Sequence, residues 1–319
     1  MSTKSKDDKN KIFIFRKLIN LMFQNVVSIL ESNFIYLSQI FARDREIKFL
    51  YKDGVRIFFT KDVPSDFAKS INSFLDHSFS DKSTLLKSTK SRAVTTDIFP
   101  QNGSNGKRIF IKRYMVTNRL KGIINLITPS KAWREMYITN KLLKSGIPTA
   151  KPLLVAEKRS NSRLKESYLI TEGIPNTKTF LSFIQSETSQ KKKRELLGKL
   201  TNFISRLHNE GFYHADLSLR NILVSETKGN DLELFVMDID KGILSKKVSS
   251  WSRAKNLFQI LRLMNQKLYF TEDDRNFLIE NYSENSNFLP PDKLWKQIKR
   301  VDLYSTIKKN YRKIKRGEI

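Results

Sequence analysis

The stretch that decides the fold is YHADLSLRNILV at Tyr213–Val224, together with MDIDKG at Met237–Gly242. The first stretch follows a helical pattern at 190–210, in which apolar residues recur with a period close to 3.6. The second closes an apolar run, LELFVM at 232–237, that is typical of a buried strand. Polar residues at fixed spacing between a helix and buried strands indicate a site that carries chemistry.

Three side chains in these stretches, Asp216, Asn221 and Asp238, form the set that phosphoryl transfer requires. The reaction needs positioning and charge neutralisation more than covalent help. A loop carboxylate such as Asp216 can accept the proton of an attacking hydroxyl. An amide and a strand-end carboxylate suit Mg²⁺, which takes few protein carboxylates besides phosphate and water oxygens. The sequence therefore predicts Asp216 as catalytic base and Asn221 and Asp238 as metal ligands.

The spacing H-x-D-L-x-x-x-N, with an aspartate after a strand about 20 residues later, matches the catalytic and metal loops of protein kinases. On that pattern His214 is a structural residue that hydrogen-bonds the backbone near Asp238. Upstream, Ile109–Lys112 resembles the V-A-I-K strand whose lysine binds ATP phosphates, and Glu135 on the next predicted helix is the expected partner of Lys112. An unrelated, solvated Lys and Glu remain the alternative for that pair.

The order of predicted elements favours an α+β fold of two lobes, as in protein kinases. We expect a tail and amphipathic helix over 1–45, a nucleotide-binding antiparallel sheet with one helix over 46–174, and a mainly helical lobe over 175–319. Strand patterns lie at 55–59, 85–92, 93–100, 108–114, 152–159 and 166–173, and helical ones at 64–76, 130–145, 252–267, 272–281 and partly 293–319. Backbone groups from Glu172 to Ile174, at the hinge, are expected to bind adenine.

Two features depart from protein kinases. The loop that covers the phosphates is glycine-rich in kinases, whereas here it is KSTKSR at Lys87–Arg92, with basic and hydroxyl side chains in place of glycine. D-F-G is replaced by D-I-D, and only about ten residues separate Gly242 from the next predicted helix. This leaves no room for the activation segment on which protein substrates dock, so a protein acceptor is not expected.

Composition narrows the chemistry further. The 319 residues include no cysteine, 59 Lys plus Arg and 32 Asp plus Glu, a net charge of +27. Disulfides, thiolate nucleophiles and Cys-ligated metals are excluded, and three histidines without an H-E-x-x-H pair argue against a His-rich metal site. The charge predicts attraction to a polyanion, whether phosphorylated substrate, anionic membrane or nucleic acid, although base composition of the gene is a competing explanation.

Residues 12–41 carry a helical apolar stripe beside basic residues. The stripe can lie on an anionic membrane surface or pack against the domain that follows, and the second interpretation is slightly favoured. Its apolar run at 18–30 is too short to span a bilayer.

Together these motifs resemble the lipopolysaccharide kinase family of Gram-negative bacteria, the Kdo kinases and core heptose kinases. The family's H-A-D-L…N-I-L and D-F-D-[KR]-G are similar to the stretches quoted first, with Asp240 and Lys241 in matching positions and Ile239 in place of Phe. KRY at 112–114 and GIPTAKP at 146–152 resemble K-R-Y and G-[IV]-P-T-x-x-P. A run beginning at Arg253 resembles the helix after the metal loop, and the likeness covers about residues 80–265.

The resemblance implies an enzyme that uses ATP and Mg²⁺ to phosphorylate a sugar hydroxyl, of Kdo or heptose, in the lipopolysaccharide inner core. It also implies a cytoplasmic protein, peripheral on the inner face of the inner membrane. The implied partners are ATP, an anionic glycolipid or sugar acceptor, and an anionic membrane, whereas nucleic acid is not expected. No residue specifies which sugar is the acceptor.

Three alternatives stay open. A small-molecule kinase of the aminoglycoside or choline type usually shows H-G-D without K-R-Y and G-I-P-T. An atypical protein kinase of the RIO or Bud type fits the charge and would bind RNA in a salt-dependent way. A pseudokinase or membrane-associated scaffold would bind Mg·ATP without turnover, but the expected base, both expected metal ligands and the lysine are all present, so loss of catalysis ranks low.

Overall fold

The computed structural model describes residues 47–80, 85–89, 92–99, 107–117, 128–160, 163–187, 189–226, 231–266 and 270–316. All of them belong to the unit Arg45–Ile319. The helical stripe predicted at 12–41 and the turn predicted between the strands at 93–100 and 108–114 lie outside the described residues.

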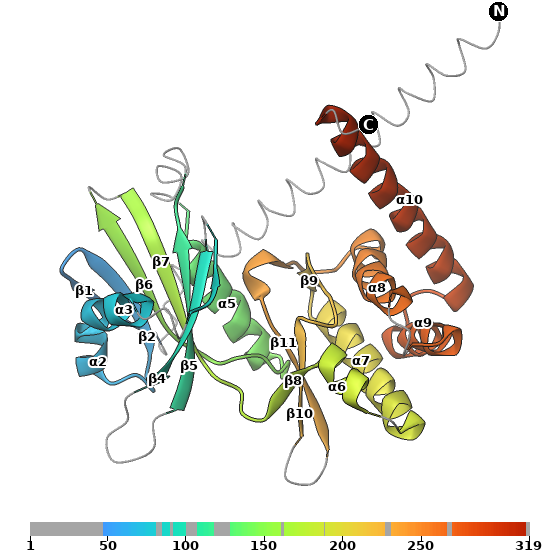
Figure 1. Ribbon diagram of the computed structural model, residues 1–319, viewed down its shortest axis with the longest axis horizontal. Coiled ribbons are helices and arrows are strands. Elements are labelled where there is room, and N and C mark those ends of the chain that lie inside the picture. The colour runs from blue at the N-terminus through green and yellow to red at the C-terminus, as the bar shows by residue number, and fades with distance from the viewer. Residues whose placement is uncertain are drawn as a thin grey trace, which may run out of the picture. The chain divides into compact units, whose positions relative to one another are not determined.

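A seven-stranded antiparallel sheet forms the first lobe (Figure 1). Its strand order is β1-β2-β6-β7-β5-β4-β3. The strands are β1 Ile47–Lys52, β2 Val55–Thr60, β3 Leu85–Ser88, β4 Arg92–Phe99, β5 Lys107–Met115, β6 Pro152–Ser160 and β7 Arg163–Glu172. The predicted hairpin partners are confirmed as β4–β5 and β6–β7. The edge strand β1 was not predicted, because neither of its faces is fully buried and its sequence shows no clean alternation.

Helices cover both faces of this sheet (Figure 1). On one face, α5 (Lys131–Lys144) carries Met136 into a small core with Val155 of the sheet. On the other, α2 (Ser65–Lys69) and α3 (Ile71–Ser80) close the larger core of the lobe. The sheet is therefore held rigid from both sides, and α5 also contacts the second lobe at 239–244.

The single helix predicted at 64–76 is two helices, because the chain turns at Ser70. The Ser70 hydroxyl and its N–H both donate to the Phe67 carbonyl, which ends α2. The prediction of one continuous helix is therefore wrong. Ser130 as the N-cap of the next helix is confirmed, since its Oγ accepts a hydrogen bond from the Trp133 N–H.

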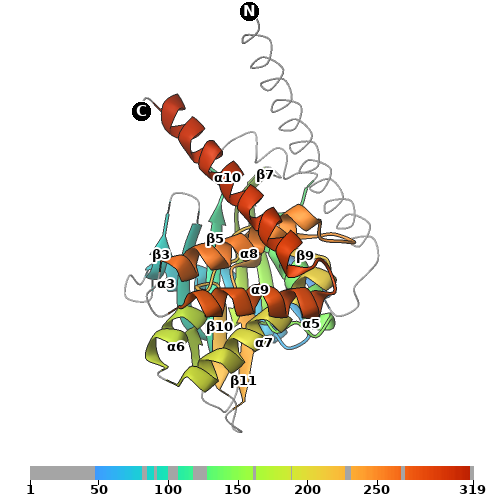
Figure 2. The ribbon, with the colours of Figure 1, turned by 90° about the vertical axis from the view of Figure 1, so that its right-hand side faces the viewer.

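The second lobe is mainly helical (Figure 2). Its elements are β8 Thr177–Thr179, α6 Phe180–Ser186, α7 Gln190–Asn209, β9 Phe212–His214, β10 Ile222–Glu226, β11 Leu232–Val236, the 3₁₀ turn η1 Ile239–Lys241, β12 Gly242–Leu244, α8 Ser250–Asn265, α9 Glu272–Ser286 and α10 Pro291–Lys315. Small sheets β11-β10-β8 and β12-β9 carry the catalytic segment. The predicted α+β class is confirmed, with a sheet lobe followed by a helical lobe.

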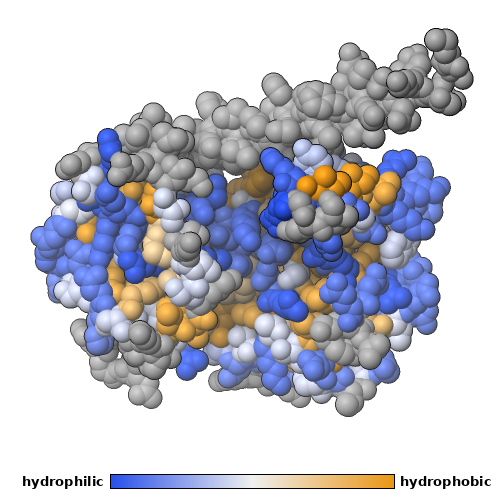
Figure 3. Space-filling view, turned by 45° about the horizontal axis from the view of Figure 1, so that its top comes forward, coloured by the Kyte–Doolittle hydropathy of each residue, from blue (hydrophilic) through white to orange (hydrophobic). Residues whose placement is uncertain are grey.

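The helix α10 is longer than predicted, and its two halves differ. Leu294, Ile298 and Val301 are buried against the lobe, whereas nearly every side chain from 306 onward is exposed. The second half projects from the body in both ribbon views (Figures 1 and 2), and an apolar strip bordered by hydrophilic side chains lies in this region of the surface (Figure 3). Within the described residues no helix is long and apolar enough to cross a membrane.

A buried histidine ties three helices of the second lobe together. His208 of α7 is fully buried, with Nδ1 2.8 Å from the Tyr282 hydroxyl of α9 and Nε2 3.1 Å from Oδ1 of Asn256 of α8. Burial lowers the pKa of His208 to about 3, even though the bond to Asn256 acts in the opposite direction. The imidazole is therefore neutral in the folded protein.

We expect mild acid to destabilise the fold through His208. Below pH 6.5 an unfolded chain protonates its histidines, while the folded chain keeps His208 neutral down to about pH 3, so stability falls as pH falls. The slope for one such proton is at most about 1.4 kcal/mol per pH unit. Urea unfolding between pH 6.5 and 4.5 measures it.

The variant His208→Gln should flatten that slope, and His77→Gln, at an exposed position, should leave it unchanged. Buried His214, whose pKa burial also lowers, contributes in the same direction and sets the residual slope. A wild-type stability that is flat over this range would contradict the assignment.

Candidate active site

Two short strand pairings bring the predicted catalytic residues together. In the β10–β11 pair, Ile222 lies opposite Val236. Asn221, just before β10, and Asp238, just after β11, therefore lie at the same end of the ladder. The Met237 N–H donates to the Asn221 carbonyl at 2.8 Å. The β9–β12 pair then draws the residues just after the metal loop back against those just before Asp216.

The side chain of Asn221 closes this arrangement. Its Nδ2 donates to the backbone carbonyl of Asp216 at 2.9 Å, which fixes the amide plane and leaves Oδ1 as the group available to a cation. Asp238 adopts a left-handed backbone conformation, φ 60° and ψ 45°, which is strained for a non-glycine residue. Such strain is typical of functional positions, where surrounding structure holds it in place.

His214 joins the catalytic loop to the metal loop. Its Nδ1 accepts from the Asp216 N–H at 3.1 Å, and its Nε2 donates to the Met237 carbonyl at 3.0 Å. The predicted structural role of His214 is confirmed. Burial lowers its pKa, so it stays neutral and keeps both bonds near pH 7.

Two amides on α8 hold the catalytic loop from behind. Asn256 Nδ2 donates to the His214 carbonyl at 2.5 Å, and Gln259 Nε2 donates to the Ala215 carbonyl at 2.6 Å. Gln259 Oε1 also accepts from the Leu217 N–H at 3.1 Å. These contacts were not predicted, since they join residues about 40 positions apart and no local pattern marks them.

Strand alternation explains where the three side chains of the KRY segment point. Lys112 and Tyr114 point to the α5 face of β5, where Lys112 Nζ lies 2.5 Å from Glu135 Oε1 and the Tyr114 hydroxyl donates to Glu135 Oε2. Arg113 points to the opposite face and pairs with Glu166. The predicted Lys112–Glu135 pair is present, and Lys112 Nζ is also 3.7 Å from Asp238 Oδ1.

Arg92, the last residue of the predicted phosphate loop, contacts the metal-loop carboxylates. Its Nη1 lies 3.1 Å from Asp238 Oδ2, its Nη2 pairs with Asp238 Oδ1, and Nη1 is 3.8 Å from Asp240 Oδ2. Burial favours the neutral acid, but the bond from Arg92 and the charge of Lys112 outweigh it and lower the pKa of Asp238 to about 2. Both oxygens of Asp238 are thus engaged by one guanidinium.

Asp240 is a second carboxylate in this cluster. Burial, and then the charges of Asp238 and Glu135, raise its pKa. Its Oδ1 is buried and has no hydrogen-bond partner among the described residues. A buried acceptor without a partner beside a strained carboxylate suits a cation, so Asp238 and Asn221, with Asp240 close by, fit Mg²⁺.

The protein ligands alone do not complete a metal site. In the described part of the chain no group of three or more His, Cys, Asp or Glu side chains is arranged to hold a metal. Mg²⁺ commonly takes its remaining ligands from phosphate and water. The donor set therefore fits a metal that arrives with a nucleotide.

The predicted base stands at the open edge of the cluster. The side chain of Asp216 is 56% exposed, and Oδ2 lies 3.5 Å from Lys241 Nζ. Lys241 was noted in the sequence only as part of the DIDKG motif, and its place beside Asp216 follows from the β9–β12 pairing. Gly242 makes that pairing possible, because a Cβ there would come within 2.4 Å of the Phe212 ring.

In the predicted hinge segment, Glu172 to Ile174, one backbone N–H is available to a ligand. The N–H groups of Glu172 and Gly173 donate to the carbonyls of Lys151 and Arg108, both at 2.8 Å. Among the described residues no acceptor is found for the Ile174 N–H. Of the predicted hinge segment, Ile174 is therefore the residue best placed to donate to a base.

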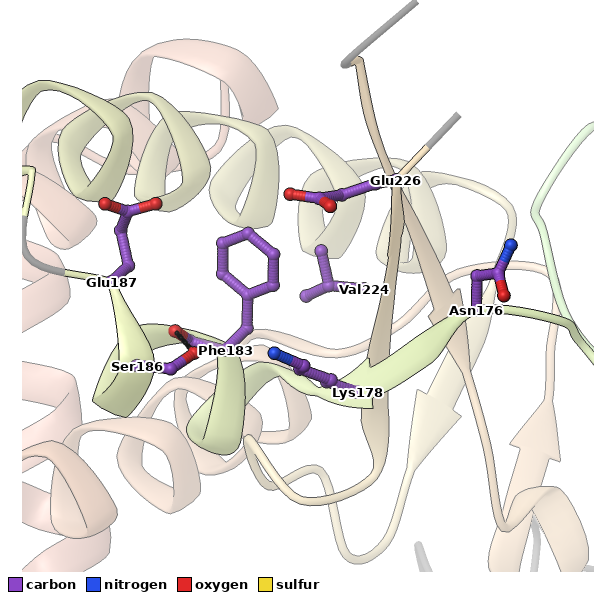
Figure 4. A pocket seen from close by; sticks show the side chains of 7 residues that line it. All are labelled: Asn176, Lys178, Phe183, Ser186, Glu187, Val224 and Glu226. Carbon is purple, nitrogen blue, oxygen red and sulfur yellow. Dashed lines mark hydrogen bonds between the residues drawn. The ribbon is translucent and has the colours of Figure 1, made fainter. Parts of the chain in front are cut away.

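A separate hollow in the second lobe does not contain these residues (Figure 4). Side chains from α6 and from strands β8 and β10 line it: Asn176, Lys178, Phe183, Ser186, Glu187, Val224 and Glu226. Its volume of about 200 Å³ is below the roughly 300–1,000 Å³ typical of ligand pockets. We assign no role in catalysis to it.

Comparison with known proteins identifies relatives of this chain. The family model described as "Lipopolysaccharide kinase (Kdo/WaaP) family" matches residues 77–282. A 3-deoxy-D-manno-octulosonic acid kinase of Actinobacillus succinogenes is 25% identical over 170 residues, 52% of this chain and 68% of the relative. One of Xylella fastidiosa strain 9a5c is 28% identical over 130 residues, 40% and 47%.

The lipopolysaccharide core heptose(I) kinase WaaP of Escherichia coli K12 is 24% identical over 164 residues, 48% of this chain and 62% of that one. These matches span about half to two thirds of the relatives' length. A solved structure, "WaaP in complex with acyl carrier protein", superposes with a TM-score of 0.53 at 16% identity, over 73% of this chain and 90% of that one. This likeness confirms the predicted protein-kinase-like fold.

Replacing Arg92 tests its hold on the metal-loop carboxylates. Because Arg92 engages both oxygens of Asp238, a metal ion must displace it, so Arg92→Gln should bind Mg²⁺ at least several-fold more tightly without nucleotide. Isothermal titration of Mg²⁺ into the protein measures this. Arg113→Gln breaks a comparable Arg–carboxylate pair elsewhere on the sheet and should change nothing. Equal Mg²⁺ affinity in wild type and Arg92→Gln would contradict the interpretation.

Proposed function

Because the chain belongs to the lipopolysaccharide kinase (Kdo/WaaP) family, we propose that it transfers the γ-phosphate of ATP to a sugar hydroxyl of the lipopolysaccharide inner core. The relatives named above are kinases of Kdo or of heptose, and phosphoryl transfer is the reaction they share. The proposed acceptor class is therefore a core sugar, with Kdo and heptose as the two candidates.

One observation supports the proposal more than any other. Asp216 and Asn221 share one loop, Asp238 follows β11 and Lys112 lies on β5 of the other lobe, yet contacts link these three segments where the lobes join. A purely structural cluster would be expected to bury and neutralise its charges. Here the base stays more than half exposed, where an acceptor hydroxyl can reach it.

Each side chain has a proposed role. Asp216 accepts the proton of the acceptor hydroxyl as the hydroxyl oxygen attacks the γ-phosphorus of ATP and ADP leaves. Lys241, beside Asp216, offsets negative charge on the γ-phosphate during transfer. Lys112, held by Glu135, binds the α- and β-phosphates of ATP. Asn221 and Asp238 would hold Mg²⁺, which when bound supplies neutralisation of phosphate charge. Glu172 to Ile174 would receive adenine through the backbone.

The acceptor and the charge of the chain also suggest where it works. A net charge of +27 favours contact with a phosphorylated glycolipid and with the anionic surface that carries it. We therefore propose a cytoplasmic enzyme that associates peripherally with the inner face of the inner membrane. The short connection between Leu244 and Ser250 leaves no platform for a peptide acceptor, which disfavours a protein kinase.

Removing the base should stop turnover without loosening the fold. Asp216→Asn keeps the size of the side chain but loses the proton acceptor, so transfer should fall by at least about a hundredfold while nucleotide affinity stays within a factor of a few. Phosphate transfer to isolated core oligosaccharide, and binding of a fluorescent ATP analogue, measure the two.

Asp231→Asn serves as the control, since Asp231 is an exposed carboxylate paired with Lys199 at the opposite end of the β10–β11 ladder from the site. Normal transfer by Asp216→Asn would refute the role of Asp216. A wild-type protein that binds Mg·ATP and never transfers phosphate would point to a pseudokinase.

Mass analysis of lipid A–core identifies the acceptor. Cells that lack the gene should lose one phosphate, and tandem fragmentation should place it on Kdo or on heptose. Restoration by the wild-type gene, but not by an Asp238→Asn allele, would tie the phosphate to this site. An unchanged core would rule out the proposed substrate class while leaving the kinase assay to judge the chemistry.

A further inference from the structure

The C-terminal helix α10 has two apolar faces, one buried against the lobe and one exposed. In its first half, Leu294, Ile298 and Val301 are buried against the lobe. In its second half, the apolar positions are Leu303, Ile307, Tyr311 and Ile314. At about 100° per residue the second set lies roughly 150° around the helix from the first. The second face therefore points away from the protein.

That face is exposed along its whole length. The exposed fractions are 63% for Leu303, 55% for Ile307, 65% for Tyr311 and 62% for Ile314. The four positions fall within a sector of about 80°, a continuous stripe over three turns. The orange strip in Figure 3 lies where this half of α10 projects. Four large apolar side chains aligned on a projecting helix mark a surface that meets a partner.

Basic side chains flank the stripe and also cover the face behind it: at about 100° per residue, Lys308 and Lys315 lie on one flank, Lys313 on the other, and Lys309, Arg312 and Arg316 behind. Residues 303–316 contain six Lys or Arg, at 308, 309, 312, 313, 315 and 316, and no Asp or Glu. Lys308 is close enough to Arg312 and to Lys255 of α8 that their charges, after partial burial, help to lower its pKa. Across the described residues none of these three has an ion-pair partner. The cluster is therefore suited to bind phosphate or carboxylate groups.

The stripe starts beside the first turn of α8, the helix that holds the catalytic loop. Tyr304 packs edge-on against Trp251, with ring centroids 5.7 Å apart. Lys255, one turn further, lies over the Tyr213 ring at 5.6 Å, and Tyr213 is three residues before Asp216. The start of the stripe is therefore connected to the catalytic loop through Trp251 and Lys255 of α8.

We propose that residues 303–316 of α10 dock the protein on an anionic lipid bilayer, with the apolar stripe in the interface and the basic side chains among the head groups. A projecting helix suits a planar fluid surface, and the lysines on both flanks of the stripe can extend toward phosphates. The inference deepens the membrane association proposed above and rests on it, but its test requires no phosphoryl transfer.

Vesicle sedimentation with the full chain tests the proposal. Wild type should bind phosphatidylglycerol-containing vesicles in a salt-sensitive way and bind pure phosphatidylcholine far more weakly. Each basic residue near such a surface contributes about fivefold in affinity, so Lys313→Glu with Lys315→Glu, one on each flank of the stripe, should weaken binding at least tenfold. Ile307→Ser with Ile314→Ser should weaken it several-fold at low and high salt alike, because it removes apolar burial rather than charge.

Matched controls lie on the other lobe. Phe49 and Tyr51 of β1 are 59% and 64% exposed, so Phe49→Ser with Tyr51→Ser removes a similar apolar area. Lys48→Glu with Lys61→Glu reverses two exposed charges there. If binding is local to α10, both control variants should bind vesicles with an affinity within about twofold of that of the wild type.

Three outcomes would overturn the inference. The first is that the α10 variants bind vesicles as the wild type does, which would assign docking to another segment, such as residues 12–41. The second is that the wild type does not prefer anionic vesicles. The third is that the α10 variants keep vesicle binding but lose binding to an acidic protein, such as an acyl carrier protein. Fluorescent ATP-analogue binding, unchanged in every variant, separates a docking failure from a failure of the kinase site.

Discussion

The site depends on the register of two short antiparallel pairs. Ile222 opposite Val236 fixes Asn221 beside the metal loop, and His214 opposite Gly242 fixes the catalytic loop beside it. A slip of one residue in either pair would turn the side chains to the other face and separate Asp216, the proposed base, from Asn221 and Asp238, the proposed metal ligands. Neither ladder is long enough to hold its own register, so the bonds from His214 and from the α8 amides secure it.

Beside these strand pairs, the negative charges of the site outnumber the positive charges by one. Three carboxylates, Glu135, Asp238 and Asp240, face two cations, Arg92 and Lys112. Such a cluster is stable only while Arg92 stays, and it becomes more negative when the guanidinium leaves. A divalent ion would restore the balance, and the released guanidinium would then be available to pair with nucleotide phosphates. If Lys87–Arg92 covers the phosphates as proposed, Arg92 would supply by side-chain charge what glycine-rich loops supply by close backbone approach.

The sequence was informative where the chemistry is local. Asp216 and Asn221 share one loop, and Asp238 ends the next strand pair, so spacing alone marked them. Lys112 and Glu135 could be paired because a strand lysine and a helix glutamate follow a known order. Arg92 and Asp238 are 146 residues apart, and no pattern links them. Strands β9 and β12 have three residues each and exist only through their partners, which is why they were not predicted.

The short link from Leu244 to Ser250 has a consequence for how an acceptor is chosen. In protein kinases a long segment after the metal loop orients the peptide beside the base, and here nothing of that kind can form. Asp216 is left open, and an open carboxylate by itself does not select among hydroxyl groups. Orientation must come from outside the loop. A lipid-linked acceptor held in a membrane plane, with the protein fixed to the same plane through α10, would meet the base from one direction only.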